Sequence, residues 1–212
     1  MAIINYIFDL DGTLANTLPV CVNAFRKALE PILNKHLSDD EIMATFGPTE
    51  DGTINTFAPH CFNQAMDSYM HHYKLEHQKC DEPFSGIREV LDTLKSKGHF
   101  TALITGKGGK CVDITLDTLQ IRDYFHAVEC GSPEGCIKQR QLMAMLEEFN
   151  LNTGETVYVG DSDYDVHEAH SCNIKAIGAA WADTADHDKL KASNPEYLFT
   201  KVSELQSFIK TR

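Results

Sequence analysis

The sequence lacks the features that mark several large classes of protein. No apolar run approaches the ~18 residues of a membrane-spanning helix, and no Cys-x-x-Cys pair is present. The seven cysteines are scattered and odd in number, which indicates reduced thiols rather than disulfides or structural zinc. The first residues carry no basic segment followed by a small-residue cleavage site, so we expect a cytoplasmic protein.

Positive charge is also scarce. The 212 residues include 19 Lys and Arg against 31 Asp and Glu, a net charge of −12, which is the wrong sign for binding a nucleic acid backbone. We therefore expect neither nucleic acid nor a membrane as a partner, and a monomer or homodimer. With 42% hydrophobic and 24% charged residues, the composition is that of a globular protein with one large domain, or a core and a small second module.

Short apolar runs alternate with segments of helical periodicity over much of the chain. Helices are predicted at 85–97 and 138–149, where apolar residues recur at helical spacing. The runs predicted as buried strands are 3–8, 100–105, 127–130, 156–160 and 176–178. This alternation is typical of an α/β fold with a doubly wound parallel sheet, here of five strands.

Residues 15–84 do not follow that alternation. An interval of about 70 residues between a strand and the next core helix is far longer than an ordinary βα connection. The interval contains helical stripes at 24–29 and 62–73, an acidic helix start at 39–41, and turn signals at Gly47-Pro48 and Gly52. We therefore predict a catalytic core formed by 1–14 and 85–212, and a small inserted helical cap domain at 15–84.

Polar residues follow three of the predicted strands. The first strand is followed by Asp9-Leu10-Asp11-Gly12-Thr13, the second by Thr105-Gly106-Lys107, and the fourth by Asp161-Ser162-Asp163-Tyr164-Asp165. Ligands of open α/β sheets bind outside the carboxyl ends of the strands. Carboxylates that converge there repel one another unless a cation neutralises them, and Mg²⁺ prefers such oxygen ligands. The sequence therefore predicts a magnesium and phosphate site.

The two aspartates after the first strand can play different roles in phosphoryl transfer. Alternation along an extended segment places Asp9 and Asp11 on the same side. One carboxylate can attack phosphorus to form an aspartyl phosphate, while the other exchanges a proton with the leaving group and with water. Thr105 and Gly106 would bind the phosphoryl oxygens, Lys138 would offset their charge, and Asp161 would complete the metal site.

Taken in order, these motifs resemble those of the haloacid dehalogenase-like hydrolase superfamily. The family's DxDGT motif matches 9–13, its Thr or Ser matches Thr105, its lysine matches Lys138, and its GDxxxD motif matches 160–165. The insert resembles the C1 helical cap of the phosphoglycolate phosphatase and β-phosphoglucomutase branch.

This resemblance implies a role for each matched residue. Asp9 would be the nucleophile and Asp11 the general acid and base, and Mg²⁺ would be held by Asp9, the Asp11 carbonyl and Asp161. Asp165 would support that metal site more indirectly. The remaining predicted substrate- and phosphate-binding residues are Leu10, Asn16, Thr49, Glu50, Gly106 and Lys107.

The sequence departs from the family pattern at three places. Gln139 follows Lys138 where this branch usually has proline, so Arg140 or Lys107 could share its role, and Lys107 is an alternative catalytic lysine. The mutases place an arginine shortly after a cap glycine, whereas 47–51 contains none. Asn16 stands where the family often has Asp.

The leading prediction is a Mg²⁺-dependent phosphatase acting on a small phosphorylated metabolite, similar to phosphoglycolate or a sugar phosphate. An inorganic pyrophosphatase or a phosphomutase would use the same core chemistry with another cap. A receiver-type phosphoacceptor or a catalytically silent interaction module are the non-enzyme alternatives. Repeated turnover of a generic aryl phosphate would separate the enzymes from both of these.

Overall fold

The computed structural model describes residues 2–211 and contains one six-stranded parallel sheet with the strand order β3-β2-β1-β4-β5-β6. The strands are β1 (Asn5–Phe8), β2 (Phe100–Ile104), β3 (Ala127–Glu129), β4 (Thr156–Gly160), β5 (Lys175–Ala179) and β6 (Tyr197–Phe199). β1 lies at the centre, where Asn5 is in register with Phe100 of β2 and with Thr156 of β4. The predicted α/β fold class is confirmed.

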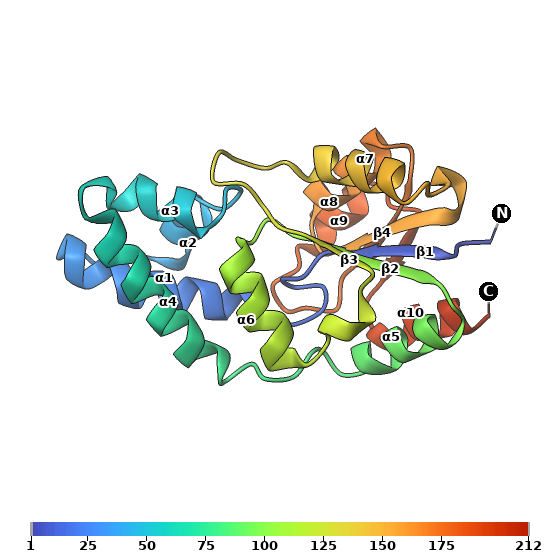
Figure 1. The fold of residues 1–212 in the computed structure, drawn as a ribbon, viewed down its shortest axis with the longest axis horizontal. Helices are drawn as coiled ribbons and strands as arrows, with labels where there is room; N and C mark the ends of the chain where they lie inside the picture. The colour runs from blue at the N-terminus through green and yellow to red at the C-terminus, as the bar shows by residue number, and fades with distance from the viewer. Residues whose placement is uncertain (1, 212) are drawn as a thin grey trace.

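Helices cover both faces of this sheet (Figure 1). One face carries α5 (Ile87–Ser96) and α10 (Val202–Lys210), and the other carries α7 (Lys138–Glu148), α8 (Asp163–Ser171) and α9 (His187–Ala192). Side chains of β1 alternate between the two layers: Tyr6 and Phe8 pack in one hydrophobic core and Ile7 in the other. Burial on both faces explains why the strands are continuous apolar runs.

Four helices are inserted between β1 and α5. They are α1 (Leu18–Leu33), α2 (Asp39–Met43), α3 (Glu50–Phe57) and α4 (Phe62–His77). α1 packs against α4, and the group has a hydrophobic core of its own that includes Phe25, Leu29 and Tyr69. Figure 1 shows these helices beside the sheet, with α6 (Gly109–Leu119) standing between them and the strands. Cys111 of α6 packs into the core of the inserted helices and joins the two parts.

Local sequence explains where the inserted helices begin and end. α1 has a proline in its first turn and ends at Asn34, whose φ of 49° is left-handed. α2 begins with a capping box, in which the Ser38 side chain accepts from the Glu41 backbone N–H and the Glu41 side chain accepts from the Ser38 backbone N–H. The acidic start predicted at 39–41 is therefore a helix start.

Two details differ from the prediction. The sheet has a sixth strand, β6, whose three half-buried residues are too few to produce a recognisable apolar run. Gly52 lies inside α3 rather than in a turn, and the chain turns before that helix, at Gly47 with a φ of 135°. Three single-turn 3₁₀ helices, η1 (Pro59–Cys61), η2 (Arg122–Tyr124) and η3 (Thr153–Glu155), complete the elements.

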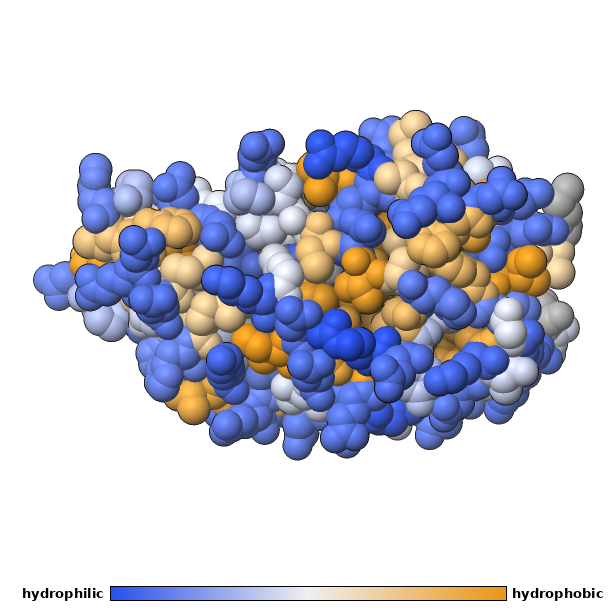
Figure 2. Space-filling view, in the orientation of Figure 1, coloured by the Kyte–Doolittle hydropathy of each residue, from blue (hydrophilic) through white to orange (hydrophobic). Residues whose placement is uncertain are grey.

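The surface seen in Figure 2 is largely hydrophilic, and its hydrophobic side chains form small separate patches, several of them near the middle of the view. Within residues 2–211, no helix is both long enough and apolar enough to cross a membrane.

Candidate active site

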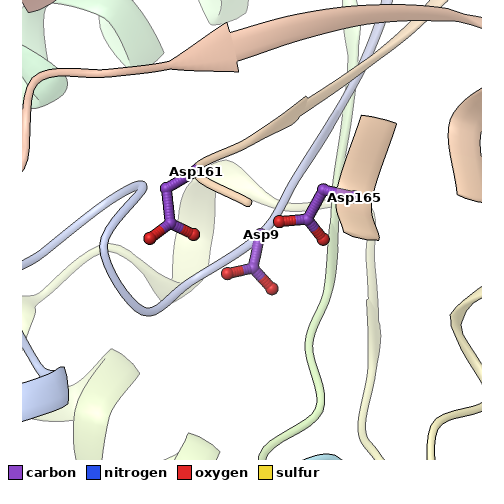
Figure 3. A group of neighbouring side chains, drawn as sticks. All are labelled: Asp9, Asp161 and Asp165. Carbon is purple, nitrogen blue, oxygen red and sulfur yellow. The ribbon is translucent and has the colours of Figure 1, made fainter. Parts of the chain in front are cut away.

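Three aspartates converge at the carboxyl ends of β1 and β4. Asp9 directly follows β1, and its backbone N–H donates to the Val159 carbonyl at 2.9 Å, which ties it to β4. One carboxylate oxygen from each of Asp9, Asp161 and Asp165 lies within 4.8 Å of the others. In Figure 3 the carboxylates of Asp161 and Asp165 lie on either side of Asp9. The sequence motifs after strands one and four thus form one cluster.

A glycine makes this convergence possible. Gly12 turns the chain away from Asp11 with a φ of +76°, and its N–H donates to the Ala15 carbonyl at 2.9 Å. A Cβ atom at position 12 would lie 2.1 Å from Oδ2 of Asp161. A side chain at this position would therefore displace the carboxylate that approaches from β4.

Burial and mutual repulsion disfavour the ionised forms of two of these carboxylates, those of Asp9 and Asp161. Desolvation raises the pKa of Asp9 to about 7, against the opposing attraction of Lys138 and with further repulsion from Asp165 and Asp11. Burial also raises the pKa of Asp161, again with repulsion from Asp9 and Asp165. A divalent cation would relieve this repulsion, and the hard oxygen donors suit Mg²⁺. The donor set therefore fits a magnesium ion.

Lys138 is the ammonium nearest to Asp9. It is the first residue of α7, and its Nζ lies 2.7 Å from Oδ1 of Asp9 and 2.5 Å from Oδ1 of Asp165. The other oxygen of Asp165 accepts from the backbone N–H and the hydroxyl of Ser162, in the capping box that begins α8. Because both of its oxygens are engaged, Asp165 is well placed to position Lys138.

Lys107 belongs to a different group of side chains. Its Nζ lies 3.2 Å from Oδ1 of Asp11, donates to Sγ of Cys21 at 2.9 Å, and lies 3.9 Å from Oε1 of Glu50. Burial raises the pKa of the Cys21 thiol to about 12 in spite of the lysine. The hydroxyl of Thr17 donates to the same oxygen of Asp11 at 2.5 Å. Asp11 is therefore held at the junction of the core and the inserted helices.

The loop after β2 carries the predicted phosphate-binding residues. The Thr105 backbone N–H donates to the Glu129 carbonyl at 3.1 Å, and its hydroxyl accepts from the Lys107 N–H at 3.2 Å. A Cβ atom at Gly131 would lie 2.0 Å from the Gly106 carbonyl oxygen, so the loop after β3 packs directly against this loop. The close approach holds Thr105 and Gly106 in place.

A cavity of about 450 Å³ joins these groups to the inserted helices. The core lines it with Asp9, Asp11, Thr105, Gly106, Lys107, Cys136, Lys138, Asp161, Ser162, Tyr164 and Asp165. The inserted helices and the loop before α3 contribute Leu18, Cys21, Phe25, Phe46, Gly47, Pro48, Thr49, Glu50 and Thr53.

Two predicted binding residues are not among these lining residues. Asn16 is exposed, and Leu10 is fully buried in the hydrophobic core. Sequence reasoning also missed Cys21, Phe25 and Tyr164. Cys21 lies four residues after Thr17, and residues four apart share one face of a helix. A correct placement of the start of α1 would therefore have identified Cys21 from the sequence.

A family model described as haloacid dehalogenase-like hydrolase matches residues 6–179. The chain belongs to this family. The family resemblance noted in the sequence is thus confirmed, and with it the prediction that the protein is an enzyme, a hydrolase. The motifs that carried the prediction from Asp9 to Asp165 all lie inside the matched residues.

Relatives extend this similarity over almost the whole chain. "Pyrophosphatase PpaX" of Bacillus mycoides (strain KBAB4) is 23% identical over 207 residues, which cover 97% of this chain and 96% of the relative. A structure titled as a predicted phosphoglycolate phosphatase from Haemophilus somnus superposes with a TM-score of 0.77 at 21% identity, covering 97% of each chain. A structure titled as a predicted phosphatase from Clostridium acetobutylicum reaches a TM-score of 0.80 at 23% identity and covers 100% of each chain. The inserted helices are therefore part of the shared fold.

Proposed function

We propose that this protein is a Mg²⁺-dependent phosphatase that hydrolyses a small phosphate monoester through a phosphorylated aspartate. The observation that carries the proposal is the surrounding of Asp9, whose carboxylate lies against the Lys138 ammonium at 2.7 Å and beside Asp161 in one cavity. The names of the relatives, pyrophosphatase and phosphoglycolate phosphatase, are consistent with phosphoryl transfer.

The metal would be held by the carboxylates of Asp9 and Asp161 and by the Asp11 carbonyl. When bound, Mg²⁺ would neutralise charge on a phosphoryl oxygen and hold it for in-line attack. Asp165 is proposed as a positioning residue, because one of its oxygens contacts Lys138 and the other contacts Ser162.

In the first step, a carboxylate oxygen of Asp9 attacks phosphorus while the bond from phosphorus to the ester oxygen breaks. Asp11 donates a proton to the departing oxygen, so an alcohol leaves and an aspartyl phosphate remains. In the second step, Asp11 takes a proton from water, and the water oxygen attacks phosphorus to release inorganic phosphate and restore Asp9. Thr105, the Gly106 N–H and Lys138 stabilise the charge on the phosphoryl oxygens in both steps.

The inserted segment 15–84 is proposed to act as the cap over the core formed by 1–14 and 85–212. Its residues line one side of the cavity, where they would exclude bulk water around the phosphoryl group. Among the described residues that line the cavity there is no arginine, which disfavours a phosphomutase that holds a second phosphate. The set of catalytic groups around Asp9 disfavours a silent interaction module.

The test is turnover of para-nitrophenyl phosphate by purified protein with Mg²⁺, combined with mass spectrometry of the peptide that contains Asp9. We expect many turnovers per molecule and a phosphoryl group on Asp9 in rapidly quenched samples. Asp163→Asn, which removes a carboxylate near the site but outside the cavity lining, is the matched control for Asp9→Asn. A single phosphorylation without further turnover would indicate a receiver-type phosphoacceptor instead.

A further inference from the structure

The cap extends one of its own carboxylates onto the core. Glu50, the first residue of α3, is 7% exposed, and its Oε2 accepts from the Gly108 backbone N–H at 2.8 Å. Gly108 is the N-cap residue of α6, an 11-residue helix that begins beside the phosphate-binding loop. A helix start of this kind attracts anions through its free N–H groups and its dipole. Glu50 therefore occupies a position where an anionic group of a substrate could otherwise bind.

Lys107, the cationic side chain next to the cap, is also occupied by groups of the protein. The side chain of Lys107 is 2% exposed, and its ammonium lies among Asp11, Cys21 and Glu50 at 3.2, 2.9 and 3.9 Å. It is thus surrounded by groups of the protein itself, two of them carboxylates. Neither the start of α6 nor Lys107 is left free to bind a second anion.

The charges around the whole cavity lead to the same conclusion. The described residues that line it include no arginine or histidine, and its two lysines face the carboxylates of Asp9, Asp11, Glu50, Asp161 and Asp165. Lys138 already contacts Asp9 and Asp165. A bound Mg²⁺ and the two lysines would bring four positive charges against these five carboxylates and the phosphoryl group, so no positive charge is left for another anion.

The remainder of the cap wall is mostly apolar. Leu18, Phe25, Phe46 and Pro48 line the cavity, and the rings of Phe25 and Phe46 lie 6.0 Å apart in a tilted arrangement. Such a wall favours an uncharged group that gains from leaving water. The volume of about 450 Å³ leaves room for a group larger than phosphate alone.

We propose that the cap selects phosphate monoesters whose leaving group is uncharged and partly apolar, and that Glu50 excludes leaving groups that carry a second anionic group. This proposal rests on the phosphatase function proposed above and adds the substrate class. The exclusion comes from the negative charge of the Glu50 carboxylate, which would repel a carboxylate or a second phosphate at close range. Pyrophosphate and phosphoglycolate should therefore both be poor substrates of this protein.

The test compares two esters of nearly equal shape, para-carbamoylphenyl phosphate and para-carboxyphenyl phosphate. With Mg²⁺ present, we expect the wild-type kcat/KM to favour the neutral carbamoyl ester by at least about tenfold, because like charges at close range are strongly disfavoured. Glu50→Gln keeps the shape of the side chain but removes its charge, and it should bring the ratio close to one. Asp40→Asn, which removes an exposed cap carboxylate on α2, should leave the ratio unchanged.

The outcomes separate this proposal from the phosphatase function. Equal use of the two esters, or preference for the carboxyl ester, would overturn the proposed selectivity while leaving the phosphatase intact. An unchanged ratio in folded Glu50→Gln would remove Glu50 as its cause. If neither ester nor para-nitrophenyl phosphate is turned over with Mg²⁺, the phosphatase function itself fails. The wild-type ratio decides the substrate class even if Glu50→Gln does not fold.

Discussion

The two sides of the cavity differ in the kind of side chain that lines them. The core side presents charged groups, several of them held by short contacts such as the 2.7 Å approach of Lys138 to Asp9. The cap side consists mainly of apolar side chains, with Glu50 as its one carboxylate. Charge at fixed positions suits the stabilisation of a transition state, whereas an apolar wall discriminates among leaving groups by shape and charge. Changes on the two sides should therefore have different kinetic effects.

The most severe test of this contrast is Asp9→Asn on the core side. An amide is far less nucleophilic than a carboxylate, and the metal site loses a charged ligand at the same time. We expect kcat to fall by more than about 10⁴-fold. Steady-state kinetics on protein purified free of other phosphatases measures this, and activity near that of the wild type would exclude Asp9 as the nucleophile.

Removal of Mg²⁺ by EDTA should reduce turnover to background, and added Mg²⁺ should restore it. Since the pKa of Asp9 is about 7 without metal, Mg²⁺ binding should release a proton and weaken as the pH falls below about 7. Thermal unfolding provides an independent measurement, because Mg²⁺ at 100 times its Kd should stabilise the fold by about 2.7 kcal/mol. Asp161→Asn should lose this Mg²⁺-dependent increase in Tm; an increase equal to that of the wild type would argue against Asp161 as a ligand.

Asp11→Ala tests the residue at the boundary between the two sides. Loss of a general acid and base should slow turnover by about 10²–10⁴-fold. The loss should be larger for an alkyl phosphate than for para-nitrophenyl phosphate, because a poor leaving group needs the proton more. Equal losses for both esters would argue that Asp11 is not the acid.

Substitutions of Lys138 and Lys107 test the same contrast between the core side and the cap side. Lys138→Ala should lower kcat by about 10²–10³-fold, because it removes a charge that stabilises the transition state. Lys107→Ala should chiefly raise KM, because Lys107 contacts Asp11, Cys21 and Glu50 at the cap boundary. Both constants are needed for both variants, and the reverse pattern would assign the catalytic role to Lys107.

Phe46→Ala on the cap side should have the smallest effect. Its ring lines the cavity beside the ring of Phe25, so we expect KM to rise by about three- to tenfold with little change in kcat. Leu75→Ala, an exposed apolar residue of α4, is the matched control. A large fall in kcat for Phe46→Ala would show that the two sides are not separate in function.

The core side was the more predictable of the two from sequence. The carboxyl ends of parallel strands lie at one edge of the sheet, so the residues that follow the apolar runs were expected to lie close together. Asp9, Lys138 and Asp161 do line one cavity. The predicted strands at 3–8, 100–105, 127–130, 156–160 and 176–178 all overlap strands of the structure. Only β6 was missed, because three half-buried residues do not form a pattern.

The cap side was less predictable for a physical reason. Which side chains of α1 and α3 face the core depends on how whole helices pack, not on a local pattern. Gly52 was expected in a turn, yet it lies in α3, where a Cβ atom would come within 2.5 Å of Pro48 and 2.6 Å of the Pro133 carbonyl oxygen. The contact between Cys21 and Lys107 joins residues 86 positions apart, and no single-sequence signal links them.

The central place of β1 in the sheet has a consequence for how the protein is made. β1 has both of its neighbours far along the chain, beginning at Phe100 in β2 and Thr156 in β4. This apolar strand therefore has no partner until β2 has been synthesised and lacks its second neighbour until β4 follows, and nascent chains with unpaired strands are prone to aggregate. Asp9 meets Asp161 only after β4 has emerged, so chains that end before that point lack the cluster of three aspartates.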